Sequence, residues 1–266
     1  MNSVSMRSVK AFDLEDIKET LKEDGFAVVS SLLSGSSELA NLQNKIYDVV
    51  SIRGGKIGLT LEERSIDGLN KLTIALDKDS PTHSGFIYDV LNQSPELFSL
   101  LNNAFLLDHI KELVFNSNAV LCSNNNSLRF HVKGRDQRTN LPWHQDSHYN
   151  DLYITDNAIA GWISIFDITK EHGPVVFKKG SHALGTLPMQ DAQYDSGRTL
   201  LGVPQSYVED ERYKECINET KAGDLVLINM DIIHRSGVNS LEDAVRWSCQ
   251  ARYHNCANPD FMPKYP

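Results

Sequence analysis

The residue pattern of the chain changes near Ala119, and this change constrains the fold more than any other feature. Before it, apolar residues recur at the helical spacing of three and four. After it, turn residues separate short runs rich in β-branched and aromatic residues, such as SLRFHV, AIAGWISIFDI, GPVVFKKG, GDLVLINM and RWSCQARYH. Such runs predict short strands, and jelly rolls and cupins are the compact folds of this kind. We therefore expect a mainly β, cupin-like core over residues 119–254, with a mainly helical flank, residues 1–118, packed outside its sheet.

Capping residues locate the helices of the flank. Asp13 predicts the start of a first helix, Ser36 or Ser37 the start of a second, and Ser94, followed by proline, the start of a third. Residues 51–90 are interrupted by glycine and proline and predict no regular element, so we expect this segment to cover a site as a loop. A chain of 266 residues can bury one large core, which favours one domain over two.

Composition excludes several classes of partner. The net charge is −9, the isoelectric point is near 5.5 and no long run of lysine and arginine occurs, so neither nucleic acid nor an anionic membrane is expected. No apolar stretch approaches the roughly 18 residues of a membrane helix, and the N-terminus lacks the apolar core of a signal peptide. We expect a cytoplasmic monomer or homodimer that binds a small molecule. The cysteines match no zinc spacing, which predicts buried, reduced thiols: Cys122, Cys216, Cys249 and Cys256.

The segment LPWHQDSHYN contains a candidate metal site. His144, Asp146 and His148 alternate, and a strand would place alternating side chains on one face. A polar strand end leading into a loop would show the same pattern, so a third ligand is needed to favour metal binding. His234 is the best candidate, because it follows the predicted strand GDLVLINM and precedes a loop rich in Ser, Gly and Asn. Two histidines and one carboxylate on one face of iron form the facial triad of non-haem Fe(II) oxygenases.

The run RWSCQARYH predicts a second part of the site. Strand alternation places Arg246, Ser248 and Gln250 on one face, and Trp247 and Cys249 on the other. A buried arginine is costly unless an anion pairs with it, and a guanidinium beside a hydroxyl is suited to binding a carboxylate. The pattern therefore predicts a clamp for the far carboxylate of a dicarboxylate co-substrate. A surface or interface arginine is the alternative.

These motifs resemble those of the phytanoyl-CoA dioxygenase family of Fe(II)/2-oxoglutarate oxygenases. PWHQD, GPVVFKKGSH and GDLVLINMDIIHRSGVN, followed by an arginine, occur in the order and approximate spacing of that family, and DGFAVV resembles its N-terminal segment. The resemblance implies a double-stranded β-helix in which His144, Asp146 and His234 bind Fe(II). It also implies 2-oxoglutarate as co-substrate and dioxygen as oxidant, with ascorbate able to support activity.

The resemblance further implies how the co-substrate is held. Arg246 would bind its far carboxylate, with Ser248 and Gln145 as secondary contacts. A further contact is expected on the strand before the metal motif, where three side chains share one face: Arg129, His131 and Lys133. Exposed positions on an edge strand are the alternative for these three residues.

The implied activity is oxidation, most simply hydroxylation, of an unactivated C–H bond in a small free molecule, with release of succinate and CO2. A halogenase of the same fold is disfavoured, because it lacks the carboxylate ligand that Asp146 supplies. A cupin-like metal-binding protein or isomerase is disfavoured by the Arg246–Ser248 face, since such a site has no dicarboxylate to hold. Residues 183–215 are a second candidate for a covering loop. The remaining candidates for the pocket, each with an ordinary core or surface alternative, are His148, Tyr149, Tyr153, Trp162, Lys178, Lys179, Arg198 and Arg252.

Overall fold

A large sheet forms the centre of the molecule. The computed structural model describes residues 8–10, 13–123, 128–134, 141–149, 158–193, 199–258 and 261. All neighbouring strands of the large sheet pair antiparallel except the first two, and β3 and β4 lie beside different halves of β12. Its strands, in spatial order, are β1 (Ser8–Lys10), β2 (Phe26–Ser30), β10 (Leu225–Asn229), β5 (Ala158–Ser164), β12 (Arg246–Asn255), and then β3 (Val120–Ser123) and β4 (Leu128–His131).

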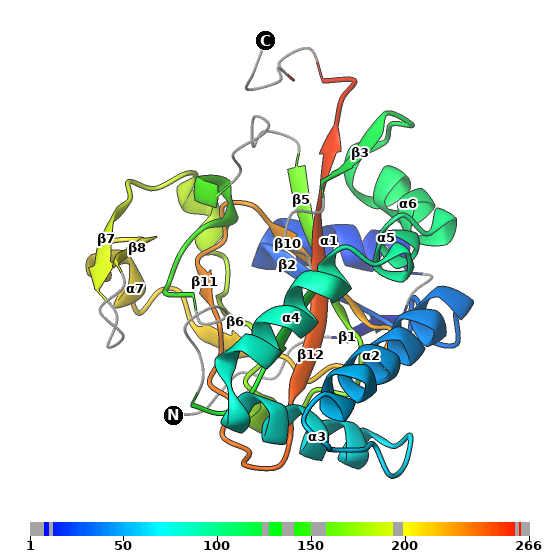
Figure 1. Cartoon of the computed structure of the whole chain (residues 1–266). Coiled ribbons are helices and arrows are strands. Elements are labelled where there is room, and N and C mark those ends of the chain that lie inside the picture. The colour runs from blue at the N-terminus through cyan, green and yellow to red at the C-terminus, as the bar shows by residue number, and fades with distance from the viewer. Residues whose placement is uncertain are drawn as a thin grey trace.

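A small antiparallel sheet lies against one face of the large sheet. It consists of β11 (His234–Arg235), β6 (Val176–Lys178) and β9 (Glu215–Ile217). The rings of Phe26 and Phe177, one from each sheet, stack with centroids 4.3 Å apart. A separate hairpin of β7 (Gln190–Gln193) and β8 (Thr199–Gly202) extends beyond the small sheet (Figure 1). The predicted β part of the chain is thus present as facing antiparallel sheets, which do not close into a barrel among the described residues.

Both faces of β2, β10 and β5 are buried, which explains why these strands are continuous apolar runs in the sequence. On β5, Ile159 and Ile163 face a core shared with the helices, whereas Ala160 and Trp162 face a second core shared with the small sheet. The same alternation applies to β2 and β10. On β12 only one face is apolar, and the opposite face carries polar side chains that include Arg246 and Ser248. Figure 1 shows the consequence: β12 runs through the centre, with β6 and β11 on one side and α2 and α3 on the other.

The helices begin where capping residues allow them to. The side chains of Asp13, Ser36 and Ser94 each accept a backbone N–H of the helix that follows, which confirms the predicted starts. The helices are α1 (Leu14–Asp24), α2 (Ser37–Gly55), α3 (Ile66–Asp79), α4 (Pro81–Asn92), α5 (Pro95–Leu101), α6 (Ala104–Ile110) with a π-helical turn (Lys111–Phe115), α7 (Gln205–Val208) and three 3-10 turns (Asp146–Tyr149, Lys170–His172 and Ser181–Leu184). No helix in this described part of the chain is long and apolar enough to cross a membrane.

The expectation that residues 51–90 form an irregular covering loop is wrong. Two helices, α3 and α4, occupy most of the segment. Ser65 and Ser80 cap them, and Pro81 takes the first helical position, where its missing N–H costs nothing. Leu69 and Ile87 are fully buried in the helix-side core, on the face of the large sheet that points away from the small sheet. These helices therefore support the large sheet.

The four cysteines are free thiols, as expected, but not all of them are buried. Cys216 and Cys249 are buried, Cys122 is half-buried and Cys256 is exposed.

Candidate metal site

His144 and His234 are neighbours because their backbones pair. The N–H of each residue donates to the carbonyl of the other at 2.9 Å, an isolated antiparallel bridge that adds His144 to the edge of the small sheet beside β11. The predicted regular strand through Asp146 is wrong. The Ser147 N–H donates to the Met230 carbonyl at 2.9 Å, and the chain turns into a 3-10 helix that begins at Asp146. A bridge followed by a turn brings the carboxylate to the histidines.

The three predicted ligands converge on one point. The Nε2 atoms of His144 and His234 lie 3.8 Å and 3.9 Å from Oδ1 of Asp146, and one ligand atom from each residue fits within 4.8 Å of the others. All three side chains are buried, and the two imidazole rings lie 4.2 Å apart between centroids. Two imidazoles and one carboxylate facing a common point are a donor set suited to a divalent transition metal.

Hydrogen bonds orient both imidazoles for metal binding. Nδ1 of His144 lies 2.7 Å from the Pro142 carbonyl, and Nδ1 of His234 lies 3.0 Å from the Ile232 carbonyl. A carbonyl only accepts, so Nδ1 carries the proton in each ring and the Nε2 lone pair faces the common point. Burial and the neighbouring His144 lower the pKa of His234 to about 4, which keeps this imidazole neutral at physiological pH.

Asp146 is held in its ionised form. Burial raises the pKa of this carboxyl, but Arg252 and the two histidines outweigh burial and hold the pKa well below its usual range. Nη2 of Arg252 donates to Oδ1 of Asp146 at 2.8 Å. From the sequence, Arg252 was only one of several general candidates for the pocket. Its contact was missed because it depends on how the 3-10 turn lies against β12, although the alternation Arg246, Ser248, Gln250, Arg252 was visible.

Arg246 and Ser248 lie on the cleft face of β12, as the alternation predicts. Both side chains are buried, at 4% and 2% exposure, and both line the cleft that contains the three candidate ligands. Nη1 of Arg246 donates to the carbonyl of Gly173. Gly173 has a φ of +69°, and an added Cβ would lie 2.4 Å from the Val238 carbonyl carbon, so only glycine fits where this carbonyl meets the guanidinium.

Gln145 is not on the cleft side, so the predicted co-substrate contact is not supported by its position. Its side chain is fully buried. Nε2 donates to the carbonyls of Gly185, at 2.9 Å, and Asp231, and Oε1 accepts the N–H of Leu187 at 2.8 Å. Successive side chains of an extended chain point to opposite sides. Gln145, which follows His144, therefore points away from the ligands, into the loops behind them.

The three candidates on the strand before the metal motif differ in position. Arg129, in register with Ser248 on β12, lines the cleft. His131, in register with Arg246, is buried next to it. Lys133 lies beyond the strand and forms an exposed ion pair with Glu242 at 2.7 Å.

Most of the weaker pocket candidates have other partners. Trp162 lines the cleft, whereas Nε2 of His148 lies 2.7 Å from the Leu187 carbonyl. Lys178 pairs with Glu215 at 3.4 Å and Lys179 with Asp24 at 2.8 Å. Residues 183–215 are only partly irregular, since they contain the β7–β8 hairpin and α7. Three predictions lie outside the described residues or side chains: Tyr149, Tyr153 and Arg198.

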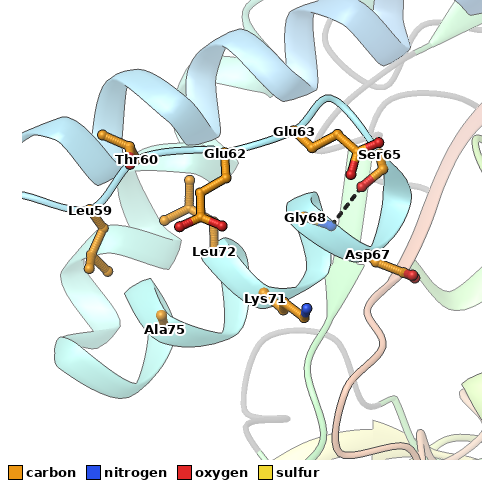
Figure 2. Close-up of a pocket in the computed structure, with 10 residues that line it drawn as sticks. All are labelled: Leu59, Thr60, Glu62, Glu63, Ser65, Asp67, Gly68, Lys71, Leu72 and Ala75. Carbon is orange, nitrogen blue, oxygen red and sulfur yellow. Dashed lines mark hydrogen bonds between the residues drawn. The ribbon is translucent and has the colours of Figure 1, made fainter.

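A second cavity lies away from the candidate metal site. It is an open hollow of about 550 Å³ between the α2–α3 connection and α3 (Figure 2). Glu62, Glu63 and Asp67 give it an acidic lining, and the Ser65 hydroxyl near them accepts the Gly68 N–H as part of the helix cap. Acidic side chains on an open surface bind no particular ligand by themselves, so we assign no site here.

The family model for phytanoyl-CoA dioxygenase (PhyH) matches residues 21–246, a range that contains all three candidate ligands and Arg246. The chain belongs to this family. Human peroxisomal phytanoyl-CoA dioxygenase is 20% identical over 225 residues, and the match covers 83% of this chain but only 62% of the human enzyme. A dioxygenase of Aspergillus hancockii is 28% identical over 109 residues, covering 39% of this chain and 30% of that protein.

Solved structures of related proteins share the fold. EctD from S. alaskensis, crystallised with 2-oxoglutarate and 5-hydroxyectoine, aligns with a TM-score of 0.59 and 22% identity, covering 97% of this chain and 80% of that one. The epimerase SnoN, crystallised with Fe3+, α-ketoglutarate and nogalamycin RO, aligns with a TM-score of 0.56 and 17% identity, covering 91% of this chain and 83% of that one. At this level of identity the similarity establishes the fold alone.

Proposed function

We propose that this PhyH-family chain is an Fe(II)- and 2-oxoglutarate-dependent oxygenase that hydroxylates an unactivated C–H bond of a small molecule. The observation that carries the proposal is the convergence of His144, Asp146 and His234 in the same cleft as the buried Arg246. The solved relatives crystallised with iron and 2-oxoglutarate support it. We further propose that the two facing sheets are the halves of a double-stranded β-helix, the architecture expected from the sequence.

Each residue of the cleft has a defined task in this proposal. The Nε2 atoms of His144 and His234 and the ionised carboxylate of Asp146 would hold the metal. Arg246, with Ser248 next to it on β12, binds the far carboxylate of 2-oxoglutarate and so orients its other end towards the metal. When bound, iron with 2-oxoglutarate and dioxygen supplies the oxidising power for C–H oxidation.

The chemistry of the cleft distinguishes this function from its alternatives. Asp146 occupies the carboxylate position that a halogenase leaves open for halide, so transfer of oxygen is favoured. A metal-dependent isomerase or cupin-like binding protein has no need for a buried arginine and serine in the cleft. Because the related structures include an epimerase and a carbocyclase, hydroxylation is the specific outcome that product analysis must test.

The test compares three variants with the wild type. Asp146→Ala should abolish binding of Fe(II) or Co(II), measured by anaerobic titration calorimetry. Arg246→Ala should keep the metal but weaken the binding of 2-oxoglutarate by about 1.5 to 3.5 decades, since truncating one partner of a buried charge pair costs about 2–5 kcal/mol. The control is Arg212→Ala, which removes an exposed arginine paired with Asp210 and should change neither property.

Activity is measured as succinate release in the presence of Fe(II), ascorbate and 2-oxoglutarate. Labelled dioxygen, 18O2, should place one 18O atom in succinate and, once a substrate is found, one in its product. Metal binding in Asp146→Ala as strong as in the wild type, or 2-oxoglutarate binding that is unchanged in Arg246→Ala, would refute the proposal. Turnover of a substrate without consumption of dioxygen would favour the isomerase instead.

A further inference from the structure

One oxygen of Asp146 faces both the histidines and an arginine. Oδ1 lies 3.8 Å and 3.9 Å from the Nε2 atoms of His144 and His234, and it accepts a hydrogen bond from Nη2 of Arg252 at 2.8 Å. The Asp146–Arg252 contact therefore fixes the oxygen that points to the candidate metal position. A free aspartate side chain can rotate this oxygen away, because its terminal torsion is broad.

The backbone of Arg252 is fixed more firmly than that of Asp146. Within β12, Arg252 pairs with Ala160 of β5 on one side and with Ser123 of β3 on the other, so the strand cannot shift without breaking two ladders. Asp146 lies at the first residue of a short 3-10 turn. A rigid strand thus holds a side chain on a less regular segment, which is the arrangement expected of a group that orients a ligand.

Burial makes this ion pair stronger than a surface pair. The side chain of Asp146 is 5% exposed and that of Arg252 is 16% exposed, whereas the Arg212–Asp210 pair has an arginine that is 73% exposed. Water screens the second pair but reaches the first poorly, so the charge-assisted hydrogen bond to Oδ1 retains its strength.

We propose that Arg252 is a positioning residue for the metal site: it holds Oδ1 of Asp146 towards the histidines before the metal arrives and keeps it there afterwards. The inference rests on the proposed function, because it assigns Asp146 to the metal. It differs from the two other roles open to a cleft arginine, which are binding the far carboxylate of 2-oxoglutarate and binding an anionic group of the substrate.

The position of Arg252 favours the positioning role. Arg246 and Arg252 lie on the same face of β12, and six residues of extended strand separate their Cα atoms by about 20 Å. The arginine that would bind the far carboxylate of 2-oxoglutarate therefore lies well away along the strand, while Arg252 lies at the candidate metal position and already contacts a carboxylate.

The experiment measures Co(II) affinity and the visible spectrum of bound Co(II) in the full chain under anaerobic conditions. Arg252→Ala should lower the affinity for Co(II) by about 10- to 100-fold, the usual effect of removing a group that hydrogen-bonds a metal ligand. It should also change the visible spectrum of the bound Co(II). Arg252→Lys keeps the charge and should recover part of the loss. Arg212→Ala removes an arginine from an exposed pair with an aspartate and should match the wild type.

Further readouts separate the possible outcomes. Urea unfolding shows whether each variant is folded; if Arg252→Ala is not, Arg252→Gln replaces it, with the same expected loss of about tenfold or more. Wild-type Co(II) affinity and spectrum in a folded Ala or Gln variant would overturn the proposal. Unchanged Co(II) affinity with weakened 2-oxoglutarate binding would assign Arg252 to the co-substrate and overturn it too. Failure of the proposed function is distinct: wild-type protein would then bind no Co(II), or Asp146→Ala would bind it equally well.

Discussion

Replacing Gln145 by alanine tests whether this side chain holds the ligand segment together. Its amide makes three hydrogen bonds, to the carbonyls of Gly185 and Asp231 and from the N–H of Leu187. Asp231 lies three residues before His234, so Gln145 connects the two backbone segments that carry the three candidate ligands. In Gln145→Ala all three bonds are lost, and the truncated site is buried.

The expected loss of stability follows from the partners that are left behind. A buried donor or acceptor without a partner costs about 1–3 kcal/mol, and carbonyls tolerate this better than an N–H because they have two lone pairs. The Leu187 N–H is the most costly of the three groups to leave without a partner, and water that enters the space can bond to some of them. We therefore expect the free energy of unfolding to fall by about 2–4 kcal/mol.

Urea unfolding of the metal-free protein measures this loss, and titration of Co(II) and 2-oxoglutarate accompanies it. The matched control is Gln43→Ala, which removes one bond, from Nε2 to the Ile165 carbonyl at 2.7 Å, and should cost about 1 kcal/mol. Gln145→Glu should cost more than Gln145→Ala, because it points a carboxylate oxygen at two carbonyls. A loss in Gln145→Ala no larger than that in Gln43→Ala would refute the reasoning. Weakened 2-oxoglutarate binding at unchanged stability would instead restore the co-substrate contact predicted from the sequence.

Two further predictions concern groups around the cleft. Gly173→Ala should destabilise the protein by more than about 2 kcal/mol in urea unfolding and weaken 2-oxoglutarate, because it adds a clash to the strain of a positive φ; Gly35→Ala, with a φ of +75° and open space around the Cβ position, should show the strain alone. Burial and Arg252 lower the pKa of His254 to about 4. In the unfolded state this histidine has a pKa near 6.5, so as the pH falls the unfolded state binds the proton first. The contribution of His254 to the free energy of unfolding is therefore full above pH 6.5 and is lost as the pH falls towards 4. From pH 7.5 to 5.5 this residue should account for about 1 kcal/mol, which His254→Gln removes in unfolding experiments on metal-free protein; an unchanged pH dependence would contradict it.

Features encoded by residue type at short range were predictable from the sequence. The helix starts at Asp13, Ser36 and Ser94 follow from side chains that satisfy backbone N–H groups three residues on. The cleft face of β12 follows from alternation alone, because Trp247 and Cys249 could only be buried on the opposite face.

Features set by contacts between distant segments were not predictable. The turn at Asp146 depends on a bond to the Met230 carbonyl, and the role of Gln145 depends on loops that lie far along the chain. Residues 51–90 were misread for a different reason. Gly54 and Gly55 end one helix and Pro81 begins another, so residues interpreted as loop signals are helix boundaries.

The register of β12 links the two ends of the cleft. Arg246 lines the cleft and Arg252 contacts Asp146, which also lines it, only because an even number of residues separates the two arginines on a strand whose side chains alternate. Insertion of one residue between them would turn one arginine into the helix-side core and place an apolar side chain in the cleft. The partner strands β5, β3 and β4 fix this register along nearly the whole of β12. Pairing of these buried strands thus sets the distance between Arg246 and the Arg252 that contacts Asp146, and with it the distance between the proposed carboxylate clamp and the candidate metal position.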